Sequence, residues 1–254
     1  MSDQGCGIDI GGSGVKGAIV DLSDGSLVGE RIRIDTPQPA TPEAVASTVA
    51  EIVKQLGWEG AVGITLPAVV TGGVARTAAN IDKSWIGTDA VALFKDALGG
   101  NSVVVLNDAD AAGLAEDKYG AGKDAKGVVI LLTFGTGIGS AVMTNGELVP
   151  NTEFGHLVVD GKEAEHRAAS SIKERDELSY KDWAKEVSLV LTHIEDLMWP
   201  DLFVAGGGVS RKGDKWIHRL DNRTPVVPAA LLNTAGIVGA AMAAERTSKG
   251  NDVE

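Results

Sequence analysis

The chain has 254 residues, of which 44% are hydrophobic and 23% charged, and its net charge is −12. These values are ordinary for a globular protein with a proper core, and the surplus of negative charge disfavours binding along a nucleic-acid backbone. No apolar run reaches the roughly 18 residues of a membrane span, the first residues lack the basic and apolar regions of a signal peptide, and the single cysteine, Cys6, excludes intrachain disulfides and cysteine-rich zinc sites. We therefore expect a cytoplasmic protein.

The first part of the chain has the pattern of an α/β domain. Residues 5–34 alternate in the manner of three consecutive strands. Thr41-Pro42-Glu43 is a helix start, with a capping hydroxyl, a proline at the first helical position and an acid near the positive end of the helix dipole, and Gly57 ends that helix. Further elements are predicted in the order strand, helix, strand, over residues 61–66, 91–98 and 102–106.

The second part continues the alternation of strands and helices. The predicted elements are a helix over 111–119, a strand pair over 128–143, an amphipathic helix over 182–197, a strand over 202–205, a short edge strand over 226–228 and a small-residue helix over 235–245. We expect one domain made of residues 1–107 with a C-terminal helix over 235–250, and a second domain over residues 108–234.

Two glycine-rich loops of similar layout each stand between two predicted strands. Their small and polar residues are Gly11, Gly12, Ser13, Gly14 and Lys16 in the first loop and Gly135, Thr136, Gly137 and Gly139 in the second. After each loop comes an apolar run and then a turn signal, Asp24-Gly25 or Asn145-Gly146, which supplies the positive φ angles of a two-residue hairpin. Each loop therefore joins two strands, and the duplication predicts two related halves whose backbone N–H groups meet one anionic ligand.

Other interpretations of the first loop exist. Residues 12–17 match the G-x-G-x-x-G pattern of dinucleotide-binding proteins, but that pattern must open a helix, and residues 18–22 resemble a strand. A purely structural glycine hairpin is the second alternative, and the matched pair of loops weakens it. The preferred interpretation is a phosphate-transferring enzyme with a cleft between two domains.

Several carboxylates stand at places where chemistry is expected. Asp108 follows a buried strand and opens a helix, a position where ligand sites collect in α/β sheets, and it can accept a proton from a substrate hydroxyl. Asp108 and Asp110 can also both cap the helix. Asp9 can hold Mg²⁺ through water near phosphates or cap a turn. Glu153 and His156 can both face a polyhydroxylated ligand, although a single histidine is often a structural hydrogen-bonding group.

Together these motifs resemble the ROK sugar kinases, and within that family the polyphosphate glucokinases, over nearly the whole chain. The similarity lies in residues 9–17 and 132–139, in residues 107–112, and in the Glu-x-Gly-His of residues 153–156. It implies an α/β, actin-like (ribonuclease H-like) fold of two domains around a central cleft. It assigns Asp108 as the catalytic base and places the two glycine loops, with Gly206, Gly207 and Gly208, at the phosphate and nucleotide site. The sugar contacts that it implies are Asn80, Asn107, Glu153, His156 and Glu165.

The same resemblance implies phosphorylation of glucose at its 6-hydroxyl, with inorganic polyphosphate, ATP or both as donor, Mg²⁺ held through water by Asp9, and a homodimer. Mannose is a further candidate acceptor. One departure from the family is the absence of cysteines between His156 and Arg167, so no zinc is expected. The alternatives are a strictly ATP-dependent hexokinase and a sugar-sensing regulator, although regulators of this family place a DNA-binding motif before the first phosphate motif, which here begins at Asp9.

Residues 210–219 form the densest cationic stretch of an otherwise acidic chain. At helical spacing Arg211, Lys215 and Arg219 would share one side. Because the stretch follows the third glycine turn, it is a candidate for guiding a polyphosphate tail, with a solvated helix face as the alternative.

Overall fold

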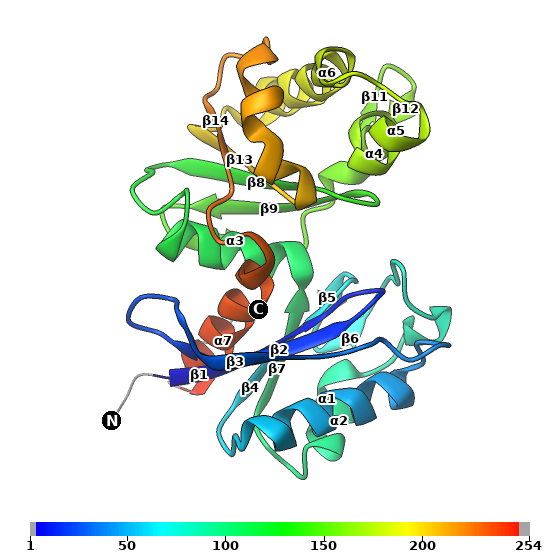
Figure 1. The fold of residues 1–254 in the computed structure, drawn as a ribbon, viewed down its shortest axis with the longest axis vertical. Helices are drawn as coiled ribbons and strands as arrows, with labels where there is room; N and C mark the ends of the chain where they lie inside the picture. The colour runs from blue at the N-terminus through cyan, green and yellow to red at the C-terminus, as the bar shows by residue number, and fades with distance from the viewer. Residues whose placement is uncertain (1–3, 249–254) are drawn as a thin grey trace. The chain divides into compact units, whose positions relative to one another are not determined.

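The computed structural model describes residues 4–248, and the chain divides into two compact units (Figure 1). Unit 1 comprises the chain up to Ala115 together with the segment from Thr234 onward, and unit 2 is Glu116–Asn233. Each unit contains one five-stranded sheet.

The sheet of unit 1 has the strand order β3-β2-β1-β4-β7. Its strands are β1 (Gln4–Ile10), β2 (Val15–Asp21), β3 (Leu27–Ile34), β4 (Val62–Leu66) and β7 (Val103–Asn107). The first three form an antiparallel meander, and β4 and β7 run parallel to β1. This confirms the predicted meander and the predicted buried parallel strands.

The helices of unit 1 begin and end largely where the sequence predicts. They are α1 (Pro42–Leu56), α2 (Ala90–Ala97), the start of α3 (Asp108–Tyr119) and α7 (Ala235–Ser248), with the 3₁₀ turn η1 (Lys83–Trp85) and the small strand pair β5 (Val70–Thr71) and β6 (Val74–Ala75). The Thr41 side chain caps α1 by accepting from the Ala44 N–H, and Gly57 ends it in the left-handed region at φ 64°. Residues 249–250 of the predicted last helix lie outside the described residues.

The two faces of the first sheet are covered by different helices. Successive residues of a strand face opposite sides, and an added Cβ at Gly7 would lie 1.9 Å from the Ile237 carbonyl oxygen, so this side carries α7 at backbone contact. On the other side, Ile52 of α1 shares a core with Ile8 and Cys6 of β1. Cys6 is fully buried there. Burial raises the pKa of the Cys6 thiol to about 12.

The sheet of unit 2 repeats this topology, with the order β10-β9-β8-β13-β14. Its strands are β8 (Val128–Phe134), β9 (Ile138–Thr144), β10 (Glu147–Val149), β13 (Leu202–Gly206) and β14 (Val226–Pro228). Again a meander of three antiparallel strands is followed by two strands that run parallel to the first of them. The prediction of two related halves, each with a glycine loop between its first two strands, is thus confirmed.

The two predicted turns differ. Asn145 and Gly146, at φ 52° and 87°, form a two-residue connection between β9 and β10, as predicted. The prediction of a two-residue turn at Asp24-Gly25 is wrong, because β2 ends at Asp21 and β3 starts only at Leu27. The carboxylates of Asp21 and Asp24 accept from the N–H groups two residues further on, and such local bonds favour a longer loop over a tight hairpin.

Shorter elements complete unit 2. They are the helices α4 (Ala164–Ala168), α5 (Ser170–Arg175) and α6 (Tyr180–Met198), the 3₁₀ turns η2 (Phe154–His156), η3 (Gly208–Lys215), η4 (Ile217–Arg219) and η5 (Leu232–Thr234), and the strand pair β11 (Val158–Val159) and β12 (Lys162–Glu163). Phe134, Trp183 and Trp216 pack edge to face in the core, with ring centroids 4.8–5.8 Å apart.

The cationic stretch is not one helix, so the predicted alignment of Arg211, Lys215 and Arg219 along one side is wrong. Helical geometry is interrupted at Lys212 (φ −115°, ψ 24°) and again at Trp216 (φ −139°). The Trp216 side chain is fully buried. Because this large ring must enter the core, the backbone turns there instead of continuing a regular helix.

Candidate active site

The first glycine loop is held by contacts within unit 1. The Gly11 N–H donates to the Gly14 carbonyl (3.1 Å), and Arg33 Nη2 donates to the Ser13 carbonyl (3.1 Å). Asn80, a predicted sugar contact, lies against this loop, because an added Cβ at Gly12 would lie 3.1 Å from the Asn80 carbonyl oxygen. The structure therefore places one predicted sugar residue beside the first predicted phosphate loop.

Asp9 lies at the end of β1, directly before this loop. Its Oδ2 is 2.9 Å from Lys16 Nζ, and its Oδ1 accepts from the Thr65 hydroxyl (3.0 Å). The Asp9 side chain is 19% exposed. Hard divalent cations prefer oxygen ligands. The partly exposed carboxylate of Asp9 and the hydroxyl of Thr65 supply such oxygens, so these two residues fit a metal that accompanies phosphates.

Asn107 and Asp108 stand at the start of α3. The Asn107 Oδ1 accepts from the N–H groups of Ala109 (2.8 Å) and Asp110 (3.2 Å), and its Nδ2 donates to the Ala68 carbonyl (3.2 Å). Asn107 is therefore the residue that caps α3, with its amide committed to the backbone. Asp108 is exposed in the first turn, and its Oδ1 also accepts from the Ala109 N–H (2.9 Å), whereas Asp110 is buried.

The second glycine loop is bonded to other parts of unit 2. The Gly135 N–H donates to the Gly137 carbonyl (2.9 Å), which closes the loop as the Gly11 N–H closes the first one. The hydroxyls of Ser170 and Ser171, at the start of α5, donate to the carbonyls of Gly135 (3.1 Å) and Thr136 (2.6 Å). These bonds fix the loop carbonyls on the α5 side.

The third glycine turn lies against the same loop. Gly207 adopts φ 81°, and an added Cβ there would be 2.3 Å from the Phe134 carbonyl oxygen. Gly206 pairs with Thr133 in the register of β13 and β8, and Gly208 begins η3. The predicted phosphate and nucleotide residues of unit 2 are thus neighbours.

The predicted sugar residues of unit 2 form one polar cluster. His156 Nδ1 is 3.3 Å from Glu163 Oε2, and His156 Nε2 is 4.0 Å from Glu153 Oε2. His166 adds contacts to Glu163 (3.6 Å) and Glu165 (3.8 Å). Glu163 and His166 were not predicted as site residues, because the sequence presents them only as part of a charged run.

Two groups of this cluster have shifted pKa values. The hydrogen bond with Glu163 raises the pKa of His156 above its ordinary value, with partial burial opposing it and the charges of Glu165 and Glu153 adding to it. Burial raises the pKa of Glu153, His156 lowers it, and Glu165 raises it, with a net rise. A protonated His156 surrounded by carboxylates can donate to hydroxyl groups while its acid neighbours accept from them.

Glu165 connects the sugar cluster to the second glycine loop. The Ile138 N–H lies 3.4 Å from Glu165 Oε2, and an added Cβ at Gly137 would come within 2.3 Å of the same oxygen. Gly155 is equally tight, since a Cβ there would lie 2.2 Å from the Ile138 carbonyl oxygen. Gly155 is therefore required by a close backbone contact, whereas Gly137 leaves the space that the Glu165 carboxylate occupies.

Three of these side chains also have the spacing of a metal site. His156, Glu163 and Glu165 each offer a ligand atom, and these atoms lie within 4.8 Å of one another. A zinc site needs about four ligands in closed geometry, and exposed acids often gather without an ion. The prediction that the protein contains no zinc stays a prediction, to be checked by elemental analysis.

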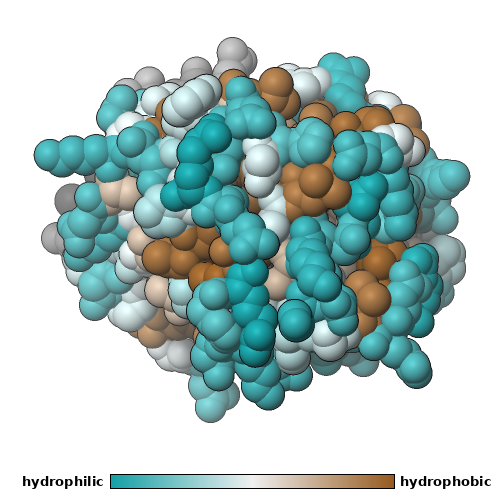
Figure 2. Space-filling view, turned by 90° about the horizontal axis from the view of Figure 1, so that it is seen from above, coloured by the Kyte–Doolittle hydropathy of each residue, from teal (hydrophilic) through white to brown (hydrophobic). Residues whose placement is uncertain are grey.

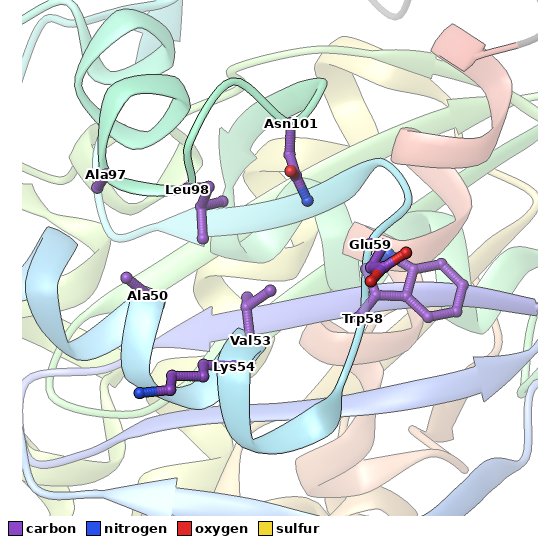
Figure 3. A pocket seen from close by; sticks show the side chains of 8 residues that line it. All are labelled: Ala50, Val53, Lys54, Trp58, Glu59, Ala97, Leu98 and Asn101. Atoms are coloured by element: carbon purple, nitrogen blue, oxygen red, sulfur yellow. The ribbon is translucent and has the colours of Figure 1, made fainter.

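An open hollow in unit 1 lies away from the candidate site residues, and Figure 3 shows the side chains around it. Its lining residues are Ala50, Val53, Lys54, Trp58, Glu59, Ala97, Leu98 and Asn101. Trp58 and Asn101 of this lining come shortly before the starts of β4 and β7. The glycine loop and Asp108, in contrast, follow the carboxyl ends of β1 and β7. Because these strands are parallel, the hollow and the candidate site residues of unit 1 lie at opposite strand ends, and only the latter is the usual ligand position.

Two observations concern the surface. No helix within residues 4–248 is long and apolar enough to cross a membrane. Seen from above the view of Figure 1, apolar side chains form small patches separated by polar ones (Figure 2). On that face the described residues therefore present no single continuous apolar surface.

Comparisons with known proteins show the family of the chain. The ROK family model matches residues 5–169. A polyphosphate glucokinase of Mycobacterium tuberculosis (strain CDC 1551 / Oshkosh) is 67% identical over 94% of this chain and 91% of its own, and one of Mycobacterium leprae (strain TN) is 65% identical over 94% of this chain and 74% of its own.

Solved structures agree as well. An inorganic polyphosphate/ATP-glucomannokinase from Arthrobacter sp. strain KM superposes with a TM-score of 0.88 at 51% identity, covering 94% of this chain and 97% of that one. A ROK family glucokinase from Streptomyces griseus, at 24% identity and a TM-score of 0.81 over 96% of this chain and 99% of that one, supports the fold alone. The predicted actin-like α/β fold is thereby confirmed, and the chain belongs to the ROK family.

Proposed function

We propose that the protein phosphorylates glucose at the 6-hydroxyl, with inorganic polyphosphate as donor and ATP as the second donor to be tested. The observation that carries this proposal is the 67% identity, over 94% of the chain, to a polyphosphate glucokinase. The two glycine loops at matching places in two units of like topology support it, because each offers backbone N–H groups to phosphate.

In this proposal Asp108 takes the proton of the 6-hydroxyl as that oxygen attacks the terminal phosphoryl group. Its exposure, in contrast to the burial of Asp110, supports the choice. The loop N–H groups beyond Gly11 and Gly135, whose own N–H groups close the loops, would stabilise the charge on the transferred phosphoryl group.

The proposed sugar contacts are Asn80 in unit 1 and Glu153, His156 and Glu165 in unit 2. Ion pairs and hydrogen bonds position the last three, so their orientations are set before the sugar binds. Asn107 is better supported as a positioning residue, since its amide caps α3 next to Asp108.

Kinase relatives imply a divalent metal with the phosphate donor, and we propose Mg²⁺. Asp9, with Thr65 beside it, would hold the ion through water. The bound ion would neutralise part of the charge on the donor phosphates. Lys16, already paired with Asp9 at 2.9 Å, would stand next to those phosphates as a second positive charge.

Further parts of the proposal are a cytoplasmic homodimer that binds neither membrane nor nucleic acid, and mannose as a second acceptor. The Arthrobacter relative is a glucomannokinase, which supports testing mannose. Light scattering of the purified protein would establish the oligomeric state.

The deciding experiment measures glucose 6-phosphate by coupled assay, with long-chain polyphosphate and ATP as donors in parallel and Asp108→Asn as the matched inactive variant. Product from polyphosphate supports the proposal. Product from ATP alone would identify a strictly ATP-dependent hexokinase. No product from either donor, with sugar binding retained, would favour the sugar-sensing regulator.

A further inference from the structure

Two segments of unit 2, α5 and η3, begin close to the second glycine loop, and each has a lysine beside the ring of the same tyrosine. α5 begins at Ser170 and Ser171, whose hydroxyls donate to the loop carbonyls at 3.1 and 2.6 Å, and Lys173 follows two residues later. η3 begins after Gly207, which lies against Phe134 at the end of β8. Both segments therefore start at the predicted phosphate site.

The two segments approach each other at Tyr180, the first residue of α6. Lys173 Nζ lies 4.3 Å from the centroid of the Tyr180 ring, and Lys215 Nζ of η3 lies 5.9 Å from it. Tyr180 and Lys173 are half-buried, and Lys215 is exposed. One aromatic ring thus holds two ammonium groups that come from different segments.

Neither of the two lysines at this ring lies within ion-pair distance of an acid among the described residues. Among residues 4–248, the ion pairs within 4.0 Å include neither Lys173 nor Lys215, nor the neighbouring exposed Arg211 and Lys212. The whole chain has a net charge of −12, and residues 210–219, which include Lys215, are its densest cationic stretch. Two ammonium groups beside one ring repel each other, and an anion lying between them would relieve that repulsion.

We propose that Lys173 and Lys215, positioned by Tyr180, bind the part of a polyphosphate chain that lies beyond the phosphoryl groups at the second glycine loop. The proposal rests on the proposed function. Lysine suits this role because its ammonium acts as a point charge that needs no fixed phosphate orientation. ATP ends its phosphate run in a neutral nucleoside, whereas polyphosphate continues as a regular series of negative charges, so the pair distinguishes the two donors.

The test compares K173Q/K215Q with a matched control, K54Q/K95Q, which removes the same charge from exposed lysines of α1 and α2 in unit 1. Steady-state kinetics are measured with long-chain polyphosphate and with ATP, at several salt concentrations. For K173Q/K215Q we expect the KM for polyphosphate to rise about five- to thirty-fold, with the ATP parameters changed less than about two-fold. The slope of log KM against log salt should fall by about 1.4, the value for two lost phosphate contacts on a single-stranded polyanion.

Variants of the ring add a second criterion. Y180F keeps the aromatic face and should match the wild type, whereas Y180L removes it and should raise the polyphosphate KM in part. Melting temperatures of all variants check that each folds.

An equal rise of KM for both donors, no rise, or the same rise in K54Q/K95Q would overturn the proposal. If the wild type makes no glucose 6-phosphate from polyphosphate, the proposed function fails, and calorimetric titration with polyphosphate alone then decides the present inference. Tighter binding by the wild type than by K173Q/K215Q supports the inference, and equal binding rejects it.

Discussion

Replacing Gly137 by alanine would test whether Glu165 must keep its present position. The new methyl carbon would lie 2.3 Å from Glu165 Oε2, about 1 Å inside ordinary van der Waals contact. The atom in its way is the end of a flexible side chain, so the carboxylate can move and the fold need not. A displacement of about 1 Å in a substrate-positioning group can cost roughly 10²-fold in rate, so we expect kcat/KM for glucose to fall by about that factor.

The matched control is Gly155→Ala, in which the added carbon meets the Ile138 carbonyl oxygen at 2.2 Å. A backbone carbonyl cannot move aside cheaply, so overpacking should cost about 1–3 kcal/mol and lower the Tm by roughly 2–12 °C. Gly137→Ala should lower the Tm by less than about 2 °C.

Coupled kinetics and thermal melts check both variants, and a double substitution checks the route of the effect. If Gly137→Ala acts by displacing Glu165, its loss of activity should largely vanish in a Glu165→Ala background. A kcat/KM within threefold of the wild type, or a Tm loss equal to that of Gly155→Ala, would refute the reasoning.

Three further predictions concern single residues. Asp108→Asn should lower kcat by roughly 10²–10⁴ while the affinity for glucose changes much less. Steady-state kinetics and isothermal titration with glucose would measure the two effects. Activity within threefold of the wild type would mean that another residue is the catalytic base. Because Glu163 raises the pKa of His156, the KM for glucose should rise as pH passes above that pKa. Glu163→Gln should move this rise in KM to lower pH. A pH profile that does not move would show that the charge of His156 does not contribute to sugar binding. Burial raises the pKa of Glu195, but bonds from the N–H groups of Thr224 and Arg223 and from the Asn222 amide outweigh this effect, and the net shift is a decrease. The stabilisation by Glu195 is therefore present above its unfolded pKa and is lost as pH falls through the folded value. Glu195→Gln should lower the Tm at pH 7 by about 2–6 °C and flatten the loss of stability in acid, and a Tm unchanged at both pH values would contradict this.

Local chemistry made much of the fold predictable. The caps of α1, a threonine hydroxyl at one end and a left-handed glycine at the other, act within a few residues of the chain. The strand–glycine loop–strand pattern is also local, and its repetition predicted the two sheets of like topology. Helix and strand ends therefore agree with the sequence to within a few residues.

The remainder depends on contacts between distant residues. Ser170 lies 35 residues from the Gly135 carbonyl to which it donates, and no spacing rule connects them. Glu163 and His166 look like a solvated charge run in the sequence, but β12 places Glu163 beside His156, and α4 places His166 beside Glu163. Helical spacing would align Arg211, Lys215 and Arg219, but the helical geometry is interrupted where the Trp216 ring enters the core of unit 2.

The sealed position of Cys6 has a practical consequence for studying motion in this protein. With a pKa of about 12, only about one thiol in 10⁵ is a thiolate at pH 7, and the side chain is fully buried. Thiol-reactive dyes should therefore leave the natural protein unmodified while it is folded. Cysteines introduced at exposed positions, one in each unit, could be labelled without first removing Cys6, and energy transfer between the dyes would measure the separation of the units with and without substrates.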